Sequence, residues 1–238
     1  MEIINKTENK LVFRANVNET FANALRRSVN RIPTMAIDEL KISKNDSALY
    51  DETVAHRFGL VPLKMEKSVK EGDVRKLKLS VKKPGFVYSG DIKGDAEIVF
   101  DKIPLTLLDE NQEMKLELTT KVGTGEEHAK YTPGLIFYRN STEITMNKTH
   151  LDAVKKAFPD NEVKVKSDKI VVLDNKPKAA LDFCEGLCER IKEKAEVKET
   201  GEIIFSVESF GQLNPKEILE KAMDILEKDL KAFGKALK

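Results

Sequence analysis

The first 46 residues are predicted to contain two strands, one amphipathic helix and a return strand, and this set of elements is too small to close a hydrophobic core. Residues 10–17 alternate apolar and polar side chains, which is typical of a half-buried strand. Phe21, Leu25 and Val29 then recur at helical spacing, after a capping residue at Asn18 or Thr20, and Pro33 ends the helix. Residues 36–43 alternate again. A later part of the chain or a partner protein must therefore cover these elements.

The middle of the chain is rich in strands. A short helix is predicted at residues 51–58, and alternating apolar and lysine side chains at residues 76–82 indicate a strand with one dry face. Residues 114–118 repeat this pattern. Turn signals divide the region at Pro84-Gly85, Ser89-Gly90, Lys93-Gly94, Gly123-Thr124-Gly125 and Pro133-Gly134. We predict that residues 47–146 form an inserted, mostly-β domain.

The last ninety residues change to a helix, strand, helix pattern, predicted at 151–158, 169–173 and 178–195, and then to a strand at 202–208. A long terminal helix follows, and its start is marked by Asn214 as N-cap, Pro215 at the first position and Glu217 three residues after the cap. Its apolar residues fall in heptads, at Leu219, Met223, Leu226, Leu230, Phe233 and Leu237. This stripe predicts a helix that packs against a partner helix, and a chain that is poorly soluble alone.

Composition and motifs exclude several classes of function. Lys plus Arg is 41 and Asp plus Glu is 40, so a net charge of +1 does not favour a surface that binds nucleic acid over its whole area. No apolar run reaches the length of a membrane helix, and the first residues lack the layout of a signal peptide, so we expect a cytoplasmic protein. Phosphate-binding glycine loops and nucleophile elbows are missing, and His56, His128 and His150 lie far apart. We therefore predict no catalytic residue, and we interpret His56 as a packing or hydrogen-bonding residue.

Two cysteines lie four residues apart on one face of a predicted helix. Cys184 and Cys188 are too few for a closed zinc site, and we interpret them as small buried hydrophobes. The cysteine spacing of bacterial ferredoxins nevertheless fits this region. One copy falls on Lys178, Leu181, Cys184 and Cys188, and a second on Lys148, Leu151, Val154 and Phe158. Residues 147–196 thus resemble a ferredoxin-like segment whose cluster ligands have been replaced by packing, and the cysteines are remnants of its motif.

Arg26 and Arg27 lie on the polar side of the first helix. One interpretation is an ordinary solvated face, and the other is a docking patch, because arginine forms fork-like contacts with carboxylates. Spacing alone leaves both open.

Four motifs carry a resemblance to a known family. Residues 23–27 (NALRR) look like the signature helix of the RNA polymerase α-subunit family, and residues 55–63 (AHRFGLVPL) resemble its archaeal and eukaryotic branch. Residues 129–133 (AKYTP) and 207–211 (VESFG) match that branch as well. The motifs occur in family order and span nearly the whole chain, and together they are highly specific.

The resemblance implies an α+β fold in which a discontinuous dimerisation domain, a sheet plus two helices from residues 1–46 and 197–238, carries the inserted domain. It also implies a non-catalytic assembly subunit that forms a heterodimer with subunit L. This dimer is the platform for the small subunits N and P and for the large catalytic subunits. The predicted interface with L consists of Phe21, Leu25, Val29, Leu219, Met223, Leu226, Leu230 and Phe233. Docking of a large subunit is assigned to Arg26, Arg27, His56 and Arg57.

Cofactors are not expected. In this family the catalytic magnesium belongs to the largest subunit. Eukaryotic relatives have a zinc loop in the inserted domain, where this chain has no cysteine, and many archaeal relatives have an iron–sulfur cluster where only Cys184 and Cys188 remain. Two competing hypotheses are an iron–sulfur electron carrier, which needs a full cysteine set, and a free-standing nucleic-acid-binding protein, which needs clustered basic charge.

Overall fold

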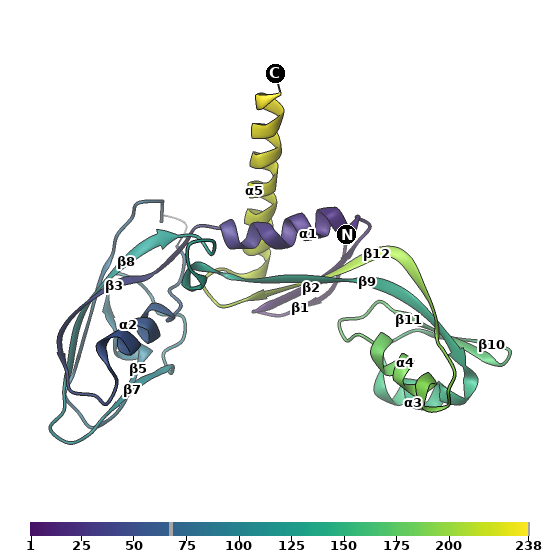
Figure 1. Ribbon diagram of the computed structural model, residues 1–238, viewed down its shortest axis with the longest axis horizontal. Coiled ribbons are helices and arrows are strands. Elements are labelled where there is room, and N and C mark those ends of the chain that lie inside the picture. Colours follow the sequence, from purple (N-terminus) through teal and green to yellow (C-terminus); the bar gives the residue numbers. More distant parts are fainter. Residues whose placement is uncertain (67–68, 238) are drawn as a thin grey trace. The chain divides into compact units, whose positions relative to one another are not determined.

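The computed structural model describes residues 1–66 and 69–237 of the chain. These residues mix helices and strands, so the predicted α+β class is confirmed. They divide into two compact units, Met1–Arg26 with Ile136–Val207 and Arg27–Leu135 with Glu208–Lys238. Figure 1 labels all of the α-helices and most of the strands.

Most of the largest sheet lies in the first unit. Among the described residues it has six strands, in the order β1 (Glu2–Lys6), β2 (Lys10–Ala15), β12 (Glu196–Ser209), β9 (Gly134–Asn147), β11 (Lys169–Asp174) and β10 (Val163–Lys166). A strand from the beginning of the chain therefore pairs with one from its end. Strand β12 begins at Glu196, six residues before the predicted start at residue 202. Residues 196–201 have no apolar alternation, so only their place beside other strands shows them to be extended.

The ferredoxin-like segment forms its own small core. Helices α3 (Leu151–Ala157) and α4 (Leu181–Arg190) pack their apolar sides against Ile144 and Met146 of β9 and Ile170 and Val172 of β11, as Figure 1 shows for the helices and strands. Helix α4 is shorter than the predicted helix at 178–195. It ends because Lys192, with φ 60°, leaves the helical conformation.

The second unit contains the β-rich region. In its described part a four-stranded sheet has the order β3 (Thr34–Asn45), β8 (Met114–Gly123), β4 (Lys76–Val81) and β6 (Lys93–Gly94), and β5 (Gly85–Tyr88) pairs with β7 (Pro104–Leu108). Helix α2 (Asp51–Gly59) lies against β3 and buries Val54 and Phe58 in the core of this region (Figure 1). Leu77 and Leu79 of β4 are buried between exposed neighbours, which confirms the predicted wet and dry faces.

Helices α1 (Glu19–Ser28) and α5 (Pro215–Ala236) complete the fold. Helix α1 continues into the 3₁₀ turn η1 (Val29–Arg31) just before Pro33, and α5 ends the described chain. The remaining 3₁₀ turns are η2 (Ser89–Asp91), η3 (Ala129–Tyr131) and η4 (Lys148–His150).

The two compact units cut the chain at other positions than the predicted domains do. Strands β9 and β12 and helix α1 each run from one unit into the other, so no unit boundary coincides with residues 46/47, 146/147 or 196/197. The predicted division into a dimerisation domain, an inserted domain and a ferredoxin-like segment stays a prediction.

Candidate subunit-docking surfaces

The start of α5 is determined locally. The Asn214 side chain accepts a hydrogen bond from the backbone N–H of Glu217 at 3.0 Å, and the Glu217 carboxylate accepts one from the N–H of Asn214 at 3.2 Å. Pro215 occupies the first helical position. These contacts confirm the predicted capping box, and they fix the residue at which α5 and its apolar stripe begin.

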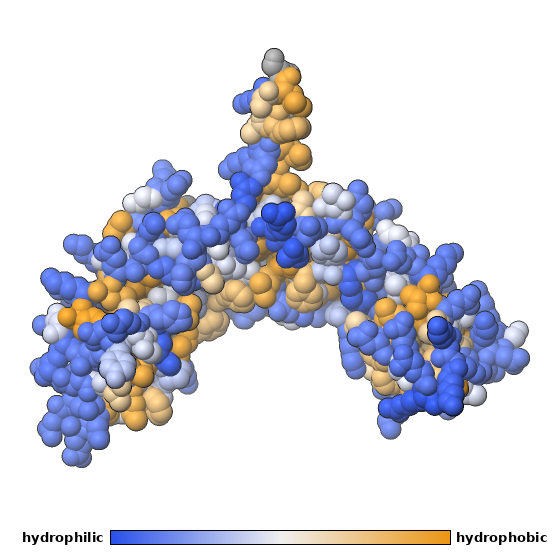
Figure 2. Space-filling model, in the orientation of Figure 1, coloured by the Kyte–Doolittle hydropathy of each residue, from blue (hydrophilic) through white to orange (hydrophobic). Residues whose placement is uncertain are grey.

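The stripe of α5 changes from buried to exposed along the helix. Leu219 is 6% exposed, whereas Leu230 and Phe233 are each 64% exposed. Leu226 lies between these extremes, and Met223 and Leu237 are exposed too. Figure 2 shows hydrophobic residues along one side of this part of the helix and hydrophilic residues on the other. Leu219 of the predicted interface therefore packs within this chain, and the second half of α5 is left without a cover among the described residues.

An ion pair attaches α5 to the turn after α1. Both terminal nitrogens of Arg31 donate to the Asp229 carboxylate, and the Nη2–Oδ1 distance is 3.1 Å. The hydrogen bond from Arg31 lowers the pKa of Asp229, and the same bond raises the pKa of Arg31. Both side chains are partly exposed, so this pair serves mainly to orient the helix.

Helix α1 presents only part of its predicted interface. Its N-terminus is capped by Asn18, whose side chain accepts from the Phe21 N–H at 2.8 Å. Phe21 is 38% exposed, but Leu25 and Val29 are each 2% exposed. In this conformation Leu25 and Val29 are buried within the chain and are not accessible to a partner. Periodicity could not show this, because a helix needs the same apolar face whether its own chain or a partner covers it.

Arginine side chains cover the outer side of the same helix. Arg26 and Arg27 are both exposed. Asn23 Oδ1 accepts from Arg26 Nη2 at 2.9 Å and from Arg26 Nε at 3.2 Å, which holds the guanidinium near the helix. Within the described residues, no carboxylate lies within ion-pairing distance of Arg27. Arg26 is thus hydrogen-bonded within its own helix, whereas Arg27 has no ion-pair partner in the described chain.

The 55–63 motif divides between core and surface. Phe58, Val61 and Leu63 are buried, whereas His56 and Arg57 are exposed. His56 lines a hollow of about 210 Å³. Its exposure argues against a packing role, and the hydrogen-bonding role stays a prediction. The hollow is also lined by His128, Asp38 and Lys130.

Asp38 connects this hollow to the 129–133 motif, and sequence reasoning missed it. Its carboxylate accepts from Lys130 Nζ at 2.6 Å and from the buried Tyr131 hydroxyl at 2.9 Å. The Lys130 hydrogen bond lowers the pKa of Asp38, whereas burial and then Asp38 raise the pKa of Tyr131. More than ninety residues separate these groups along the chain, so no local signal could have found the pair.

The 207–211 motif lies against the 129–133 motif. The Phe210 N–H donates to the Pro133 carbonyl at 3.0 Å. Gly211 has φ 104°, and a Cβ there would lie 2.4 Å from Val99 Cγ1, so both backbone conformation and space call for glycine. Residues 208–211 and 129–133 thus contact each other within the second unit.

The two cysteines lie in the core of the ferredoxin-like segment. Cys184 is 0% and Cys188 is 1% exposed, and both pack with Val154 and Phe158. Burial raises the pKa of the Cys184 thiol to about 12. The structure thus confirms that the cysteines are buried hydrophobes, and it places the six non-lysine positions of the ferredoxin frame in one core. Among the described residues, no three His, Cys, Asp or Glu side chains are grouped as a metal site requires.

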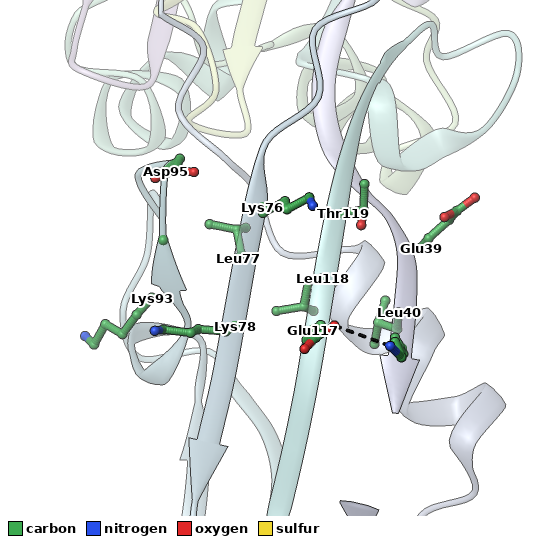
Figure 3. Close-up of a pocket in the computed structure, with 12 residues that line it drawn as sticks. Glu39, Leu40, Lys76, Leu77, Lys78, Lys93, Asp95, Glu117, Leu118 and Thr119 are labelled. Atoms are coloured by element: carbon green, nitrogen blue, oxygen red, sulfur yellow. Dashed lines mark ion pairs between the residues drawn. The ribbon is translucent and has the colours of Figure 1, made fainter. Parts of the chain in front are cut away.

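A hollow with a volume of about 570 Å³ lies on the four-stranded sheet. Figure 3 shows its side chains, which come from β3, β4, β6 and β8. Lys41 pairs with Glu117 at 3.9 Å, and the other charged lining residues are Glu39, Lys76, Lys78, Lys93 and Asp95. Carboxylates alternate with lysines here, so the hollow lacks the concentrated positive charge of a nucleic-acid site.

No helix within residues 1–66 and 69–237 combines the length and the apolar character that crossing a membrane requires.

Comparison with known proteins gives one consistent result. The model of the RNA polymerase Rpb3/RpoA insert domain family matches residues 40–137. DNA-directed RNA polymerase subunit Rpo3 of Pyrococcus furiosus is 34% identical, with 98% of this chain and 95% of the relative covered. Subunit Rpo3 of Thermococcus kodakarensis is 33% identical over 88% of this chain and 86% of the relative. Subunit Rpo3 of Archaeoglobus fulgidus is 32% identical over 100% of this chain and 97% of the relative.

Proposed function

Because this chain belongs to the Rpo3 family of archaeal DNA-directed RNA polymerase subunits, we propose that it is a non-catalytic assembly subunit that forms a heterodimer with subunit L. The observation that carries the proposal is the exposed apolar stripe in the second half of α5, where Leu230 and Phe233 are each 64% exposed. An apolar helix face of this kind favours association with another apolar surface.

The proposed interface with L is smaller than the interface predicted from the sequence. It consists of the exposed or half-exposed residues Phe21, Met223, Leu226, Leu230 and Phe233. Leu25, Val29 and Leu219 are left out of it because they are buried in this chain. We propose further that the dimer is the platform for subunits N and P and for the large catalytic subunits, and that residues 1–46 and 197–238 form its dimerisation domain.

Arg26, Arg27, His56 and Arg57 are the proposed contacts with a large subunit. All four are exposed, and arginine forms strong paired hydrogen bonds with carboxylates. The double variant Arg26→Ala/Arg27→Ala should keep the heterodimer with L and lose recruitment of the second-largest subunit. Coexpression with L, followed by addition of the purified large subunit and size-exclusion chromatography, tests this. If the variant loses L instead, the assignment of the two faces of α1 is wrong.

Coexpression also tests the central proposal. The chain alone should be poorly soluble, and coexpressed L should bring it into solution as a stoichiometric complex. A chain that stays monomeric and soluble in the presence of L would contradict the proposed function.

We propose that residues 147–196 fold without a metal and that the chain has no cofactor. In support, Val154 and Phe158 are buried at positions where a ferredoxin has ligands, and burying such a side chain contributes roughly 1.5–3 kcal/mol. Metal analysis of well-folded protein should find neither iron nor zinc. Stoichiometric amounts of either metal would reject this part of the proposal.

A further inference from the structure

The two-stranded sheet of β5 and β7 has an apolar outer face. Phe86 of β5 and Leu107 of β7 lie directly opposite each other in the register, and they are 58% and 55% exposed. The ring of Tyr88 lies 6.0 Å from that of Phe86, and Tyr88 is 39% exposed. Val87 and Leu105 are buried on the opposite side. An antiparallel strand pair at a protein surface usually has one polar face, so this pair, which is apolar on both faces, indicates a surface that a partner covers.

One cation lies at the border of this face. Arg57 of α2 donates from Nη2 to the carbonyl oxygen of Pro104 at 2.8 Å, which holds its guanidinium beside β7. Arg57 and Phe86 line a hollow of about 220 Å³ together with Ala48, Leu49 and residues 104–107. Arg57 is the charged residue among them, and no carboxylate of the described chain lies within ion-pairing distance of it. Its other N–H donors are available to an acceptor from outside.

We propose that this face, formed by Phe86, Tyr88, Leu107 and Arg57, binds a segment of another polymerase subunit in which apolar side chains flank an aspartate or glutamate. This rests on the proposed function and deepens it, because it gives the chemistry of the partner segment that Arg57 meets. Aromatic residues and arginine dominate the energetics of protein interfaces. A carboxylate is the group that pairs with the fork of N–H donors on a fixed guanidinium.

The charge of the face favours a protein over a nucleic acid. Nucleic-acid binding takes its affinity from several cations along a phosphate backbone, and the hollow offers Arg57 alone. The exposed residues opposite each other on β5 and β7 are an aromatic ring and a leucine, which suits an apolar side chain better than a stack of bases.

The test is site-specific crosslinking in assembled polymerase. A photoreactive phenylalanine analogue replaces Phe86 in one preparation and Glu110, an exposed residue of the same unit, in a control. We expect Phe86 to crosslink to one segment of another subunit, identified by mass spectrometry, that contains an acidic residue among apolar ones. The Glu110 position should give no crosslink to that segment.

Charge reversal then tests the role of Arg57. In Arg57→Glu the crosslink at position 86 should fall about tenfold, the effect of losing a charge-assisted hydrogen bond. Changing the mapped carboxylate to lysine in the same background should restore it. Thermal unfolding of Arg57→Glu and of the milder Arg57→Gln shows whether the fold is kept, and Arg57→Gln should also lower the yield.

Four results would overturn the proposal: equal crosslinking from Phe86 and Glu110, an adduct with DNA or RNA, a mapped segment without a carboxylate, or a yield that neither Arg57 variant changes. Copurification of subunit L is measured on the same preparations. Loss of L from the unmodified chain counts against the proposed function, whereas a complete polymerase without the Phe86 crosslink counts against this face alone.

Discussion

Replacing Leu230 and Phe233 by alanine should separate the role of α5 in assembly from its role in the fold of the chain. Each side chain is 64% exposed, so the folded chain alone loses little when it is truncated. In a heterodimer the partner would cover this surface. The double variant should therefore weaken the complex with L and leave the free energy of unfolding of the chain almost unchanged.

The expected size of the effect follows from the exposed fraction. Full burial of a leucine or phenylalanine side chain is worth roughly 1.5–3 kcal/mol, and about two thirds of each remains to be buried by the partner, which gives about 2–4 kcal/mol for the pair. Since about 1.4 kcal/mol is a factor of ten, the Kd for L should rise roughly 30- to 800-fold. The change belongs mainly in the dissociation rate.

Two control variants make the interpretation specific. Leu219→Ala truncates a residue of the same stripe that is 6% exposed, and it should lower the free energy of unfolding by about 2–5 kcal/mol. Lys228→Ala changes an exposed polar residue of α5 and should affect neither quantity.

Binding of the dilute chain to immobilised L gives the Kd and the dissociation rate, and urea unfolding of the dilute chain, followed by circular dichroism, gives the stability. The reasoning is refuted if the double variant binds L as tightly as the unmodified chain. It is refuted as well if that variant destabilises the free chain as much as Leu219→Ala does, because the stripe would then pack within this chain.

Three further predictions concern contacts within the chain. Asn214→Ala removes the acceptor of the capping box and should lower the free energy of unfolding by about 1 kcal/mol in urea titrations; an unchanged midpoint would mean that the cap contributes nothing. Arg139→Met removes the two hydrogen bonds of 2.9 and 3.0 Å from the buried Asp174 carboxylate, and it should lower the free energy of unfolding by roughly 3–5 kcal/mol in the same titrations. Adding Asp174→Leu should recover most of this loss rather than add to it. Because the pKa of Asp38 is lowered in the folded chain, its carboxylate stabilises the fold above the ordinary carboxyl pKa, and this stabilisation is lost as pH falls through the lowered value. Asp38→Asn should therefore make the decrease in Tm at acid pH less steep. An equally steep decrease in the variant would contradict the role of the Lys130 hydrogen bond.

Features that depend on neighbouring residues could be predicted from the sequence. The capping box at Asn214 and Glu217 forms as expected, because its donors and acceptors lie within one helical turn. The alternation at β4 gave the correct face of the strand, since the side-chain period of a strand is two. The four family motifs are local strings too, and they identified the family.

The sequence did not predict where some helices and strands begin or end, or which apolar side chains remain exposed. Helix α4 ends at Arg190 and β12 begins at Glu196, and neither change is marked by a proline or an apolar pattern. The alternation at residues 85–88 places Phe86 and Tyr88 on one face and Val87 on the other, but all three are apolar, so the sequence did not tell which face the core would cover.

The sequence by itself determined the class of fold, the helix that begins at Asn214, the burial of Cys184 and Cys188 and the family. Only the tertiary structure decided which apolar residues remain for a partner. Leu219 and Leu230 belong to one stripe and have the same side chain, yet one is 6% and the other 64% exposed. Periodicity shows that a helix face is apolar, but segments distant in the sequence decide which part of that face is buried. For α5 one such segment is η1, whose Arg31 pairs with Asp229.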